Sequence, residues 1–300
     1  MSIELPAPLK VVEVRMEDGA IIRIRQHGNP AGPRLALSHG NGLAIDGYFP
    51  FWDLLRARYE LILFDFRNHG QNPLHSFAHH DWQHFISDLE RIWRVIAAEY
   101  GAKRIAGVFH SLSAVTSAVH TQRMGLRWDP LVLFDPPFYP RDGHPLQDVQ
   151  SGNEDNIAAR ADRRPERYAD VSGLAAQFAR RFTLWQPGAH ELMARATLRR
   201  DPEAGDWILA CPREYEAHVF RSNRDTSAWT NLAHMPVAVK LICADPQVGD
   251  TPSKIGKAIS EEMPVEYEAI PHSTHFLQIE QPTECIGLME AFLVKHGMAA

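Results

Sequence analysis

Short apolar runs alternate along this chain with longer segments whose apolar residues recur every three or four positions. The run ELILFDF at 60–66, for example, precedes a segment over 82–102 in which Phe85, Leu89 and Ile96 fall on one helical face. An unbroken apolar run is typical of a strand buried on both sides, and the longer spacing is typical of an amphipathic helix. The alternation therefore predicts an α/β fold with a mostly parallel central sheet flanked by helices.

The sequence changes in character between about 138 and 232. This region has more Arg, Asp and Glu, fewer strand-like runs and several short helical patterns, and the apolar run PVAVKLICADP follows it at 236–246. We therefore expect a core domain over 1–137 and 233–300, with a mainly helical insertion over 138–232 after the sixth predicted strand.

Charge and composition exclude several kinds of partner. The 300 residues carry a formal net charge of -6, and no basic stripe or basic amphipathic helix is visible. We thus expect neither a nucleic acid nor a membrane surface as partner. No apolar run approaches the roughly 20 residues that span a bilayer. A small-molecule substrate remains, and the oligomeric state is left open.

The cysteines and the first residues of the chain both bear on the cellular compartment. Cys211, Cys243 and Cys285 are odd in number and show no CxxC spacing, which is typical of free thiols. The first residues contain no apolar segment after a basic start, as a secretory signal would. We therefore expect a cytoplasmic protein.

Polar and glycine-rich clusters follow the predicted strands. They are SHGNG at 38–42, DFRNHG at 65–70, FHSLS at 109–113, LFDPP at 133–137, LICADP at 241–246 and PHSTH at 271–275. In a parallel sheet, ligands bind at the carboxyl ends of the strands. A serine, histidines and aspartates are therefore expected to meet in one crevice.

The order and spacing of these clusters resemble those of the α/β-hydrolases over nearly the whole chain. SHGNG is similar to the family's HG oxyanion loop, and DFRNHGQNP to its D-x-R-G-H-G-x-S segment, with Asn68 and Pro73 as departures. FHSLS stands in the place of the nucleophile elbow, and PHSTHFLQIEQP is similar to the segment with the catalytic histidine. The resemblance implies the α/β-hydrolase fold, a cap formed by 138–232, and serine chemistry that needs no metal or organic cofactor.

Ser111 is the candidate nucleophile. A nucleophile elbow holds its serine in a strained strand-to-helix turn, where small neighbours relieve crowding. Ser113 and Ala114 are small, but Phe109, two places before the serine, is bulky. We expect the turn to survive at Ser111 with the Phe109 ring packed into the core. The alternative is a serine that only caps a helix.

His275 is the candidate general base. An imidazole with a pKa of about 6.5 can accept and return a proton near neutral pH. His275 precedes Phe276 and lies shortly before Glu280 and Pro282, as the resemblance requires. His272 is the rival histidine.

The acid and the oxyanion donors complete the predicted site. Asp245 ends a predicted strand and is the preferred acid, while Asp135 and Asp250 remain alternatives. The resemblance implies that the backbone amides of Leu112 and Asn41 form the oxyanion hole.

These residues predict a serine hydrolase that cleaves an ester, thioester or related acyl bond through an acyl-enzyme. We expect a small or medium, largely apolar substrate. One alternative is a carbon–carbon bond hydrolase or lyase that uses the same serine. The other is a ligand-binding or signalling protein with little turnover, which Phe109 and Gln247 favour because neither suits the family pattern.

Overall fold

An eight-stranded sheet forms the centre of the molecule in the computed structural model, which describes residues 3–300. The strands follow the order β1-β2-β4-β3-β5-β6-β10-β11, and β2 is antiparallel to both of its neighbours while the pairs from β4 to β11 are parallel. The strand bounds are β1 Lys10–Arg15, β2 Ile21–Gly28, β3 Arg34–Ser38, β4 Glu60–Phe64, β5 Ile105–His110, β6 Leu131–Phe134, β10 Val239–Ala244 and β11 Glu266–Ile270. The predicted mostly parallel sheet is confirmed.

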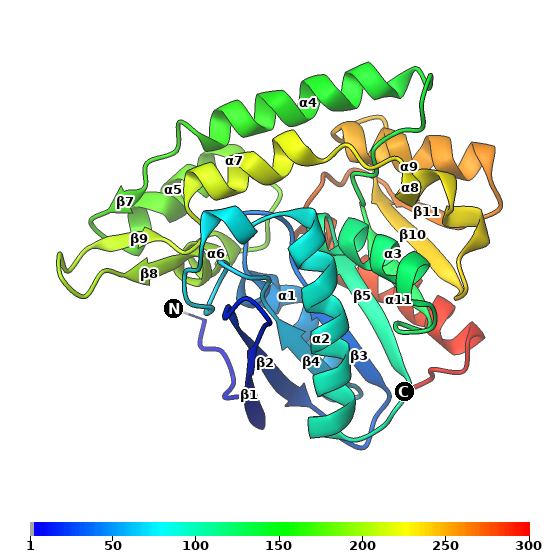
Figure 1. The fold of residues 1–300 in the computed structure, drawn as a ribbon, viewed down its shortest axis with the longest axis horizontal. Helices are drawn as coiled ribbons and strands as arrows, with labels where there is room; N and C mark the ends of the chain where they lie inside the picture. The colour runs from blue at the N-terminus through cyan, green and yellow to red at the C-terminus, as the bar shows by residue number, and fades with distance from the viewer. Residues whose placement is uncertain (1–2) are drawn as a thin grey trace.

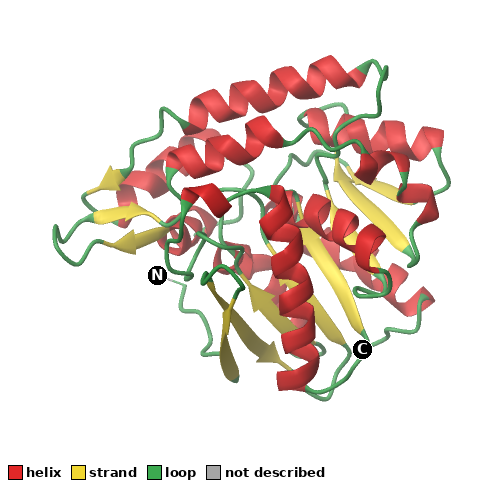
Figure 2. Ribbon diagram, in the orientation of Figure 1, coloured by secondary structure: helices red, strands yellow, loops and turns green. Residues whose placement is uncertain are grey.

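Helices cover both faces of this sheet (Figures 1 and 2). One face packs against α2 (Trp82–Tyr100), α3 (Leu112–Met124) and α9 (Thr251–Glu262), and the other against α1 (Phe49–Trp52), α10 (Leu277–Glu280) and α11 (Pro282–Lys295). Strand β6 shows how one strand serves both layers: Leu131 and Leu133 belong to the first core, and Val132 and Phe134 to the second. Successive side chains of a strand point to opposite faces, so a strand between two helical layers must be apolar throughout.

Local signals set the bounds of the longest helix, α2. The side chain of Asp81 accepts a hydrogen bond from the amide of His84 and so caps the first turn. Gly101, with φ of 83°, ends the helix.

The chain between β6 and β10 forms a separate group of elements that overlies one edge of the sheet. It contains the helices α4 (Leu146–Ala161), α5 (Val171–Arg181), α6 (Ala189–Thr197), α7 (Arg213–Ser222) and α8 (Ser227–Thr230). It also contains a three-stranded sheet in the order β7-β9-β8, formed by β7 (Arg167–Tyr168), β9 (Trp207–Leu209) and β8 (Leu198–Arg200). Helices α4 and α7 lie side by side across the top of Figure 1. We call this group the insertion; its limits at 138 and 232 stay a prediction.

Within residues 3–300, none of the helices combines the length and the apolar character that a membrane span requires.

Candidate active site

The turn at Ser111 joins a strand directly to a helix. Strand β5 ends at His110 and α3 begins at Leu112, so Ser111 alone makes the turn. Its φ of 53° and ψ of −115° lie where residues other than glycine are rare. The Ser111 side chain makes no capping hydrogen bond to α3, and its Oγ lies 3.0 Å from Nε2 of His275. The turn presents the hydroxyl to the histidine, which leaves the helix-cap alternative without support.

The bulky Phe109 does not disturb this turn because its ring lies in the core, as predicted. The ring is fully buried and packs edge-on against Trp128 and Phe64, with centroid distances of 5.4 and 6.2 Å. Gly107 makes room for it: a Cβ at position 107 would lie 2.6 Å from the Phe109 ring. A glycine two residues earlier thus compensates for the missing small residue at 109.

His275 connects Ser111 to a buried carboxylate. Its Nε2 faces the Ser111 hydroxyl, and its Nδ1 lies 2.7 Å from Oδ2 of Asp135. Asp135 follows β6, is fully buried, and accepts a further hydrogen bond at Oδ1 from the amide of Ala244. Burial lowers the pKa of His275, but the hydrogen bond and the charge of Asp135 outweigh burial, so the net pKa is above the usual value.

The preference for Asp245 as the partner of His275 is wrong in this geometry. The Asp245 carboxylate instead accepts hydrogen bonds from the amides of His272 and Gln247, both at 2.9 Å. Asp250 lies at the beginning of α9, and its side chain makes no hydrogen bond to His275. The sheet order β5-β6-β10 explains the difference, because Asp135 ends the strand next to the one that carries Ser111. His272, the rival histidine, is exposed and lies away from the serine hydroxyl.

The loop over 39–42 carries the proposed oxyanion amide of Asn41 and is held by two buried histidines. His39 accepts a hydrogen bond at Nε2 from the amide of Phe66 (3.1 Å), and His69 accepts one at Nε2 from the amide of Gly42 (3.1 Å). Burial lowers the pKa of His39 to about 4 and that of His69 to about 3, so both stay neutral acceptors at pH 7.

The two amides expected to bind an oxyanion are available. In the part of the chain that the structure describes, no hydrogen bond from the backbone amides of Asn41 or Leu112 is found. The side chain of Asn41 is engaged elsewhere, since its Nδ2 donates to the carbonyl of Glu216 in α7 (2.9 Å). Free amides beside a strained serine are the arrangement that an oxyanion hole needs.

A chain of hydrogen bonds that the sequence did not predict connects the three loops of the site. The amide of Gly40 donates to Oη of Tyr48 (3.2 Å), and Oη pairs with Nδ1 of His110 (2.7 Å). Nε2 of His110 then pairs with the carbonyl of His275 (2.8 Å). These contacts are consistent when Tyr48 donates to Nδ1 and His110 donates from Nε2. Because His110 directly precedes Ser111, the sequence could have indicated that His110 lies in the site. No sequence pattern indicates that Tyr48 does.

A cavity of about 660 Å³ opens beside Ser111 and His275. One part of its wall is apolar, with Leu174, Phe178 and Phe276 among its residues. Five arginines also line it, namely Arg160, Arg163, Arg164, Arg180 and Arg181. Apolar and charged side chains therefore share the wall of this cavity.

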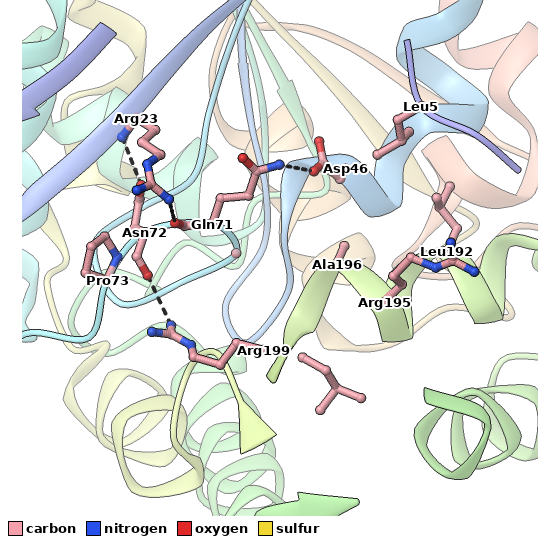
Figure 3. A pocket seen from close by; sticks show the side chains of 12 residues that line it. Leu5, Arg23, Asp46, Gln71, Asn72, Pro73, Leu192, Arg195, Ala196 and Arg199 are labelled. Carbon is pink, nitrogen blue, oxygen red and sulfur yellow. Dashed lines mark hydrogen bonds between the residues drawn. The ribbon is translucent and has the colours of Figure 1, made fainter. Parts of the chain in front are cut away.

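A second cavity, of about 510 Å³, contains none of the candidate catalytic residues (Figure 3). Its polar side chains are bound to their neighbours: Gln71 donates to Asp46, Arg23 to the carbonyl of Gln71, and Arg199 to the carbonyl of Asn72. We attribute the chemistry to the first cavity.

Among residues 3–300, two clusters bring potential metal ligands together: His69 with His80 and Cys211, and Asp18 with His75 and His79. In the first, both ring nitrogens of His69 already make hydrogen bonds, to the carbonyl of Arg67 and from the amide of Gly42. In the second, Asp18 is ion-paired with Arg67. Neither cluster offers a free set of ligands.

Comparison with known proteins agrees with this architecture. A family model described as alpha/beta hydrolase family matches residues 35–288, so the chain belongs to the alpha/beta hydrolase family. No curated protein sequence matches the chain.

Three solved structures show the breadth of the fold. E-2-(acetamidomethylene)succinate hydrolase superposes with a TM-score of 0.78 at 17% identity, covering 95% of this chain and 100% of that one. The thioesterase domain from the curacin biosynthetic pathway gives 0.72 at 12% identity, with 93% and 98% coverage. N-formylmaleamic acid deformylase from Pseudomonas putida S16 gives 0.65 at 15% identity, with 93% and 100% coverage. At these identities the likeness shows the fold alone.

Proposed function

We propose that this protein is a serine-dependent hydrolase that cleaves an ester, thioester or related acyl bond through an acyl-enzyme. The observation that carries the proposal is the hydrogen-bonded series Ser111–His275–Asp135, with contacts of 3.0 and 2.7 Å. A hydroxyl becomes a good nucleophile when a base takes its proton and a carboxylate orients that base.

The first half of the reaction forms the acyl-enzyme. Oγ of Ser111 attacks the substrate carbonyl carbon while its proton moves to Nε2 of His275. The carbonyl oxygen gains negative charge, and the amides of Leu112 and Asn41 donate to it. The tetrahedral intermediate collapses, the bond to the leaving group breaks, and His275 gives its proton to that group.

The second half releases the acid. His275 takes a proton from water, and the hydroxide oxygen attacks the acyl carbon. The ester bond to Ser111 breaks, and His275 returns the proton to Oγ. One water is consumed, and the products are an acid and the protonated leaving group. Asp135 keeps Nδ1 of His275 protonated and stabilises the imidazolium throughout.

The alternative of a binding or signalling protein loses both features that favoured it. The Phe109 ring lies in the core and not in the cavity. Because Asp135 pairs with His275, no acid is needed at the position after β10 that Gln247 occupies. We further propose that the insertion over 138–232 acts as a cap over the cavity, to which its helices α4, α5 and α7 contribute residues. A cytoplasmic location stays a prediction.

Labelling with a fluorophosphonate probe tests the proposed nucleophile. We expect the wild-type protein to be labelled, Ser111→Ala to lose the label, and Ser260→Ala, a change on α9 outside the cavity, to keep it. A wild-type protein that never reacts, or a label that survives Ser111→Ala, would contradict the proposal.

A further inference from the structure

The wall of the main cavity carries an excess of positive charge. Five guanidinium groups line it, against the three carboxylates of Glu154, Glu216 and Asp250. All five arginines lie between positions 160 and 181, in and between α4 and α5 of the insertion. The whole chain has a formal net charge of -6, so this is a local concentration and not a property of a basic protein.

Among residues 3–300, only Arg164 of these five arginines has a carboxylate counter-ion. Arg164 is satisfied by a two-point contact with Glu216, at 2.7 and 2.8 Å. By contrast, the side chains of Arg160, Arg180 and Arg181 make neither an ion pair nor a hydrogen bond to any residue from 3 to 300, and that of Arg163 donates only to the carbonyl of Ala159. Arg160 and Arg181 line the same cavity, and partial burial followed by the charges of Arg160 and Arg164 lowers the pKa of Arg181. Cations that face one cavity without an anion repel each other, and a bound anion removes that cost.

Aromatic contacts connect Arg181 to the catalytic end of the cavity. Its guanidinium lies 5.1 Å from the centroid of the Phe182 ring, which packs edge-on against Phe276 at 4.6 Å. Phe276 directly follows His275, and their rings are 5.5 Å apart. The Phe182 and Phe276 rings therefore form an apolar layer between the Arg181 guanidinium and the catalytic histidine.

We infer that the substrate is an acyl compound with a carboxylate group, which Arg160 and Arg181 bind while Ser111 attacks the acyl carbon. This inference rests on the proposed function. A guanidinium matches the two oxygens of a carboxylate. A phosphate would fit the same donors, but its second negative charge would be repelled by Asp250 and Glu154 in the same wall. The apolar residues between the arginines and His275 suit the aliphatic part of such an acid.

Two chromogenic esters of equal chain length test the inference: 4-nitrophenyl hydrogen glutarate, which is anionic, and 4-nitrophenyl valerate, which is neutral. We expect kcat/KM of the wild type to favour the anionic ester at least about tenfold. Arg160→Gln and Arg181→Gln should each reduce that preference by roughly tenfold or more, mainly through KM, and Arg181→Lys should restore part of it. Arg91→Gln, an exposed arginine on α2 outside the cavity, should leave the preference unchanged.

The outcomes separate this inference from the proposed function. If neither ester is hydrolysed in a Ser111-dependent way, the proposed function fails. If valerate is preferred, or if the preference for glutarate survives both glutamine substitutions, the inference fails while the function stands. Calorimetric titration of Ser111→Ala with glutarate decides the inference without turnover. Binding that is lost in Ser111→Ala/Arg181→Gln supports it, whereas no binding, or tighter binding of inorganic phosphate, would overturn it.

Discussion

The cavity has two sides that are built in opposite ways. On the core side, the side chains of Asp135, His110 and His275 each have a defined hydrogen-bond partner, and Asp135 and His110 are fully buried. On the insertion side, the side chains of Arg160 and Arg181 line the cavity without a hydrogen-bond or ion-pair partner among residues 3–300. Buried groups whose hydrogen bonds are all made hold a fixed geometry, whereas cations without a counter-ion favour the binding of an anion. The difference suggests that the core side carries out the chemistry and the insertion side selects the substrate.

If this division holds, the largest loss should come from Asp135→Asn. Asparagine keeps the shape but cannot hold Nδ1 of His275 in the required state, and we expect kcat to fall by about 10⁴-fold, as it does for the same change in a Ser-His-Asp protease. We expect KM to change little. Steady-state kinetics with 4-nitrophenyl valerate measures both constants.

The matched control for that change is Asp245→Asn. The Asp245 carboxylate only accepts from two backbone amides near the surface, so kcat should stay within a few-fold of the wild type. A loss with Asp245→Asn as large as that with Asp135→Asn would show that the acid has been assigned to the wrong strand.

The core side was also the side that the sequence could predict. Ser111, His275, Asp135 and Asp245 follow predicted strands, and the carboxyl ends of parallel strands converge at one edge. The choice between Asp135 and Asp245 depended on whether β6 or β10 adjoins β5, and strand order is a long-range property that no local pattern encodes. Tyr48 was missed for the same reason, because its partner His110 lies 62 residues away.

The insertion side escaped prediction because helical periodicity does not say which face meets a cavity. The short helical patterns over 173–182, 189–200 and 212–220 indicated α5, α6 and α7, which are present, but none of them marked α4. However, α4 and α5 bring their arginines together only after both have packed over the sheet edge. The small second sheet was also missed, because β7 has two residues and β8 and β9 have three, too few to show alternation.

A smaller effect on the core side is expected from Tyr48→Phe. Removing Oη breaks the link between Gly40 and His110 and leaves Nδ1 of a fully buried histidine without a donor. An unsatisfied buried group costs about 1–3 kcal/mol, so the melting temperature should fall. We also expect kcat for the neutral ester to fall by about tenfold with little change in KM, because the oxyanion loop and the histidine loop lose their common support.

Tyr267→Phe is the matched control, since the Tyr267 hydroxyl is buried and has no hydrogen-bond partner in the described chain. Its removal should leave both stability and kcat near the wild-type values. If Tyr48→Phe behaves like Tyr267→Phe, the hydrogen-bond chain does not position the site.

The smallest predicted effect tests whether the two sides are independent. Glu154, on α4 of the insertion, lines the cavity, and burial raises its pKa to about 7. Its charge is among the groups that raise the pKa of His275. A carboxylate near His275 favours the imidazolium, so neutralising Glu154 should lower the apparent pKa of His275. The acidic limb of kcat/KM against pH, which we expect above pH 6.5 in the wild type, should then move to lower pH by less than about one unit in Glu154→Gln.

Glutamine can replace Glu154 with little disturbance, because Oε1 accepts from Gln150 and Asn223 while the buried Oε2 has no partner. The profile should be measured with the neutral ester, so that substrate binding by the arginines does not contribute. Glu284→Gln, an exposed change on α11, provides the control. At pH 8, where Glu154 is mostly ionised in the wild type, Glu154→Gln should also lower KM for the anionic ester, because one repelling charge is gone. A shift of the acidic limb without a change in this KM would mean that Glu154 acts on the histidine alone. The carboxylate of the substrate would then be bound too far from Glu154 to be repelled by it.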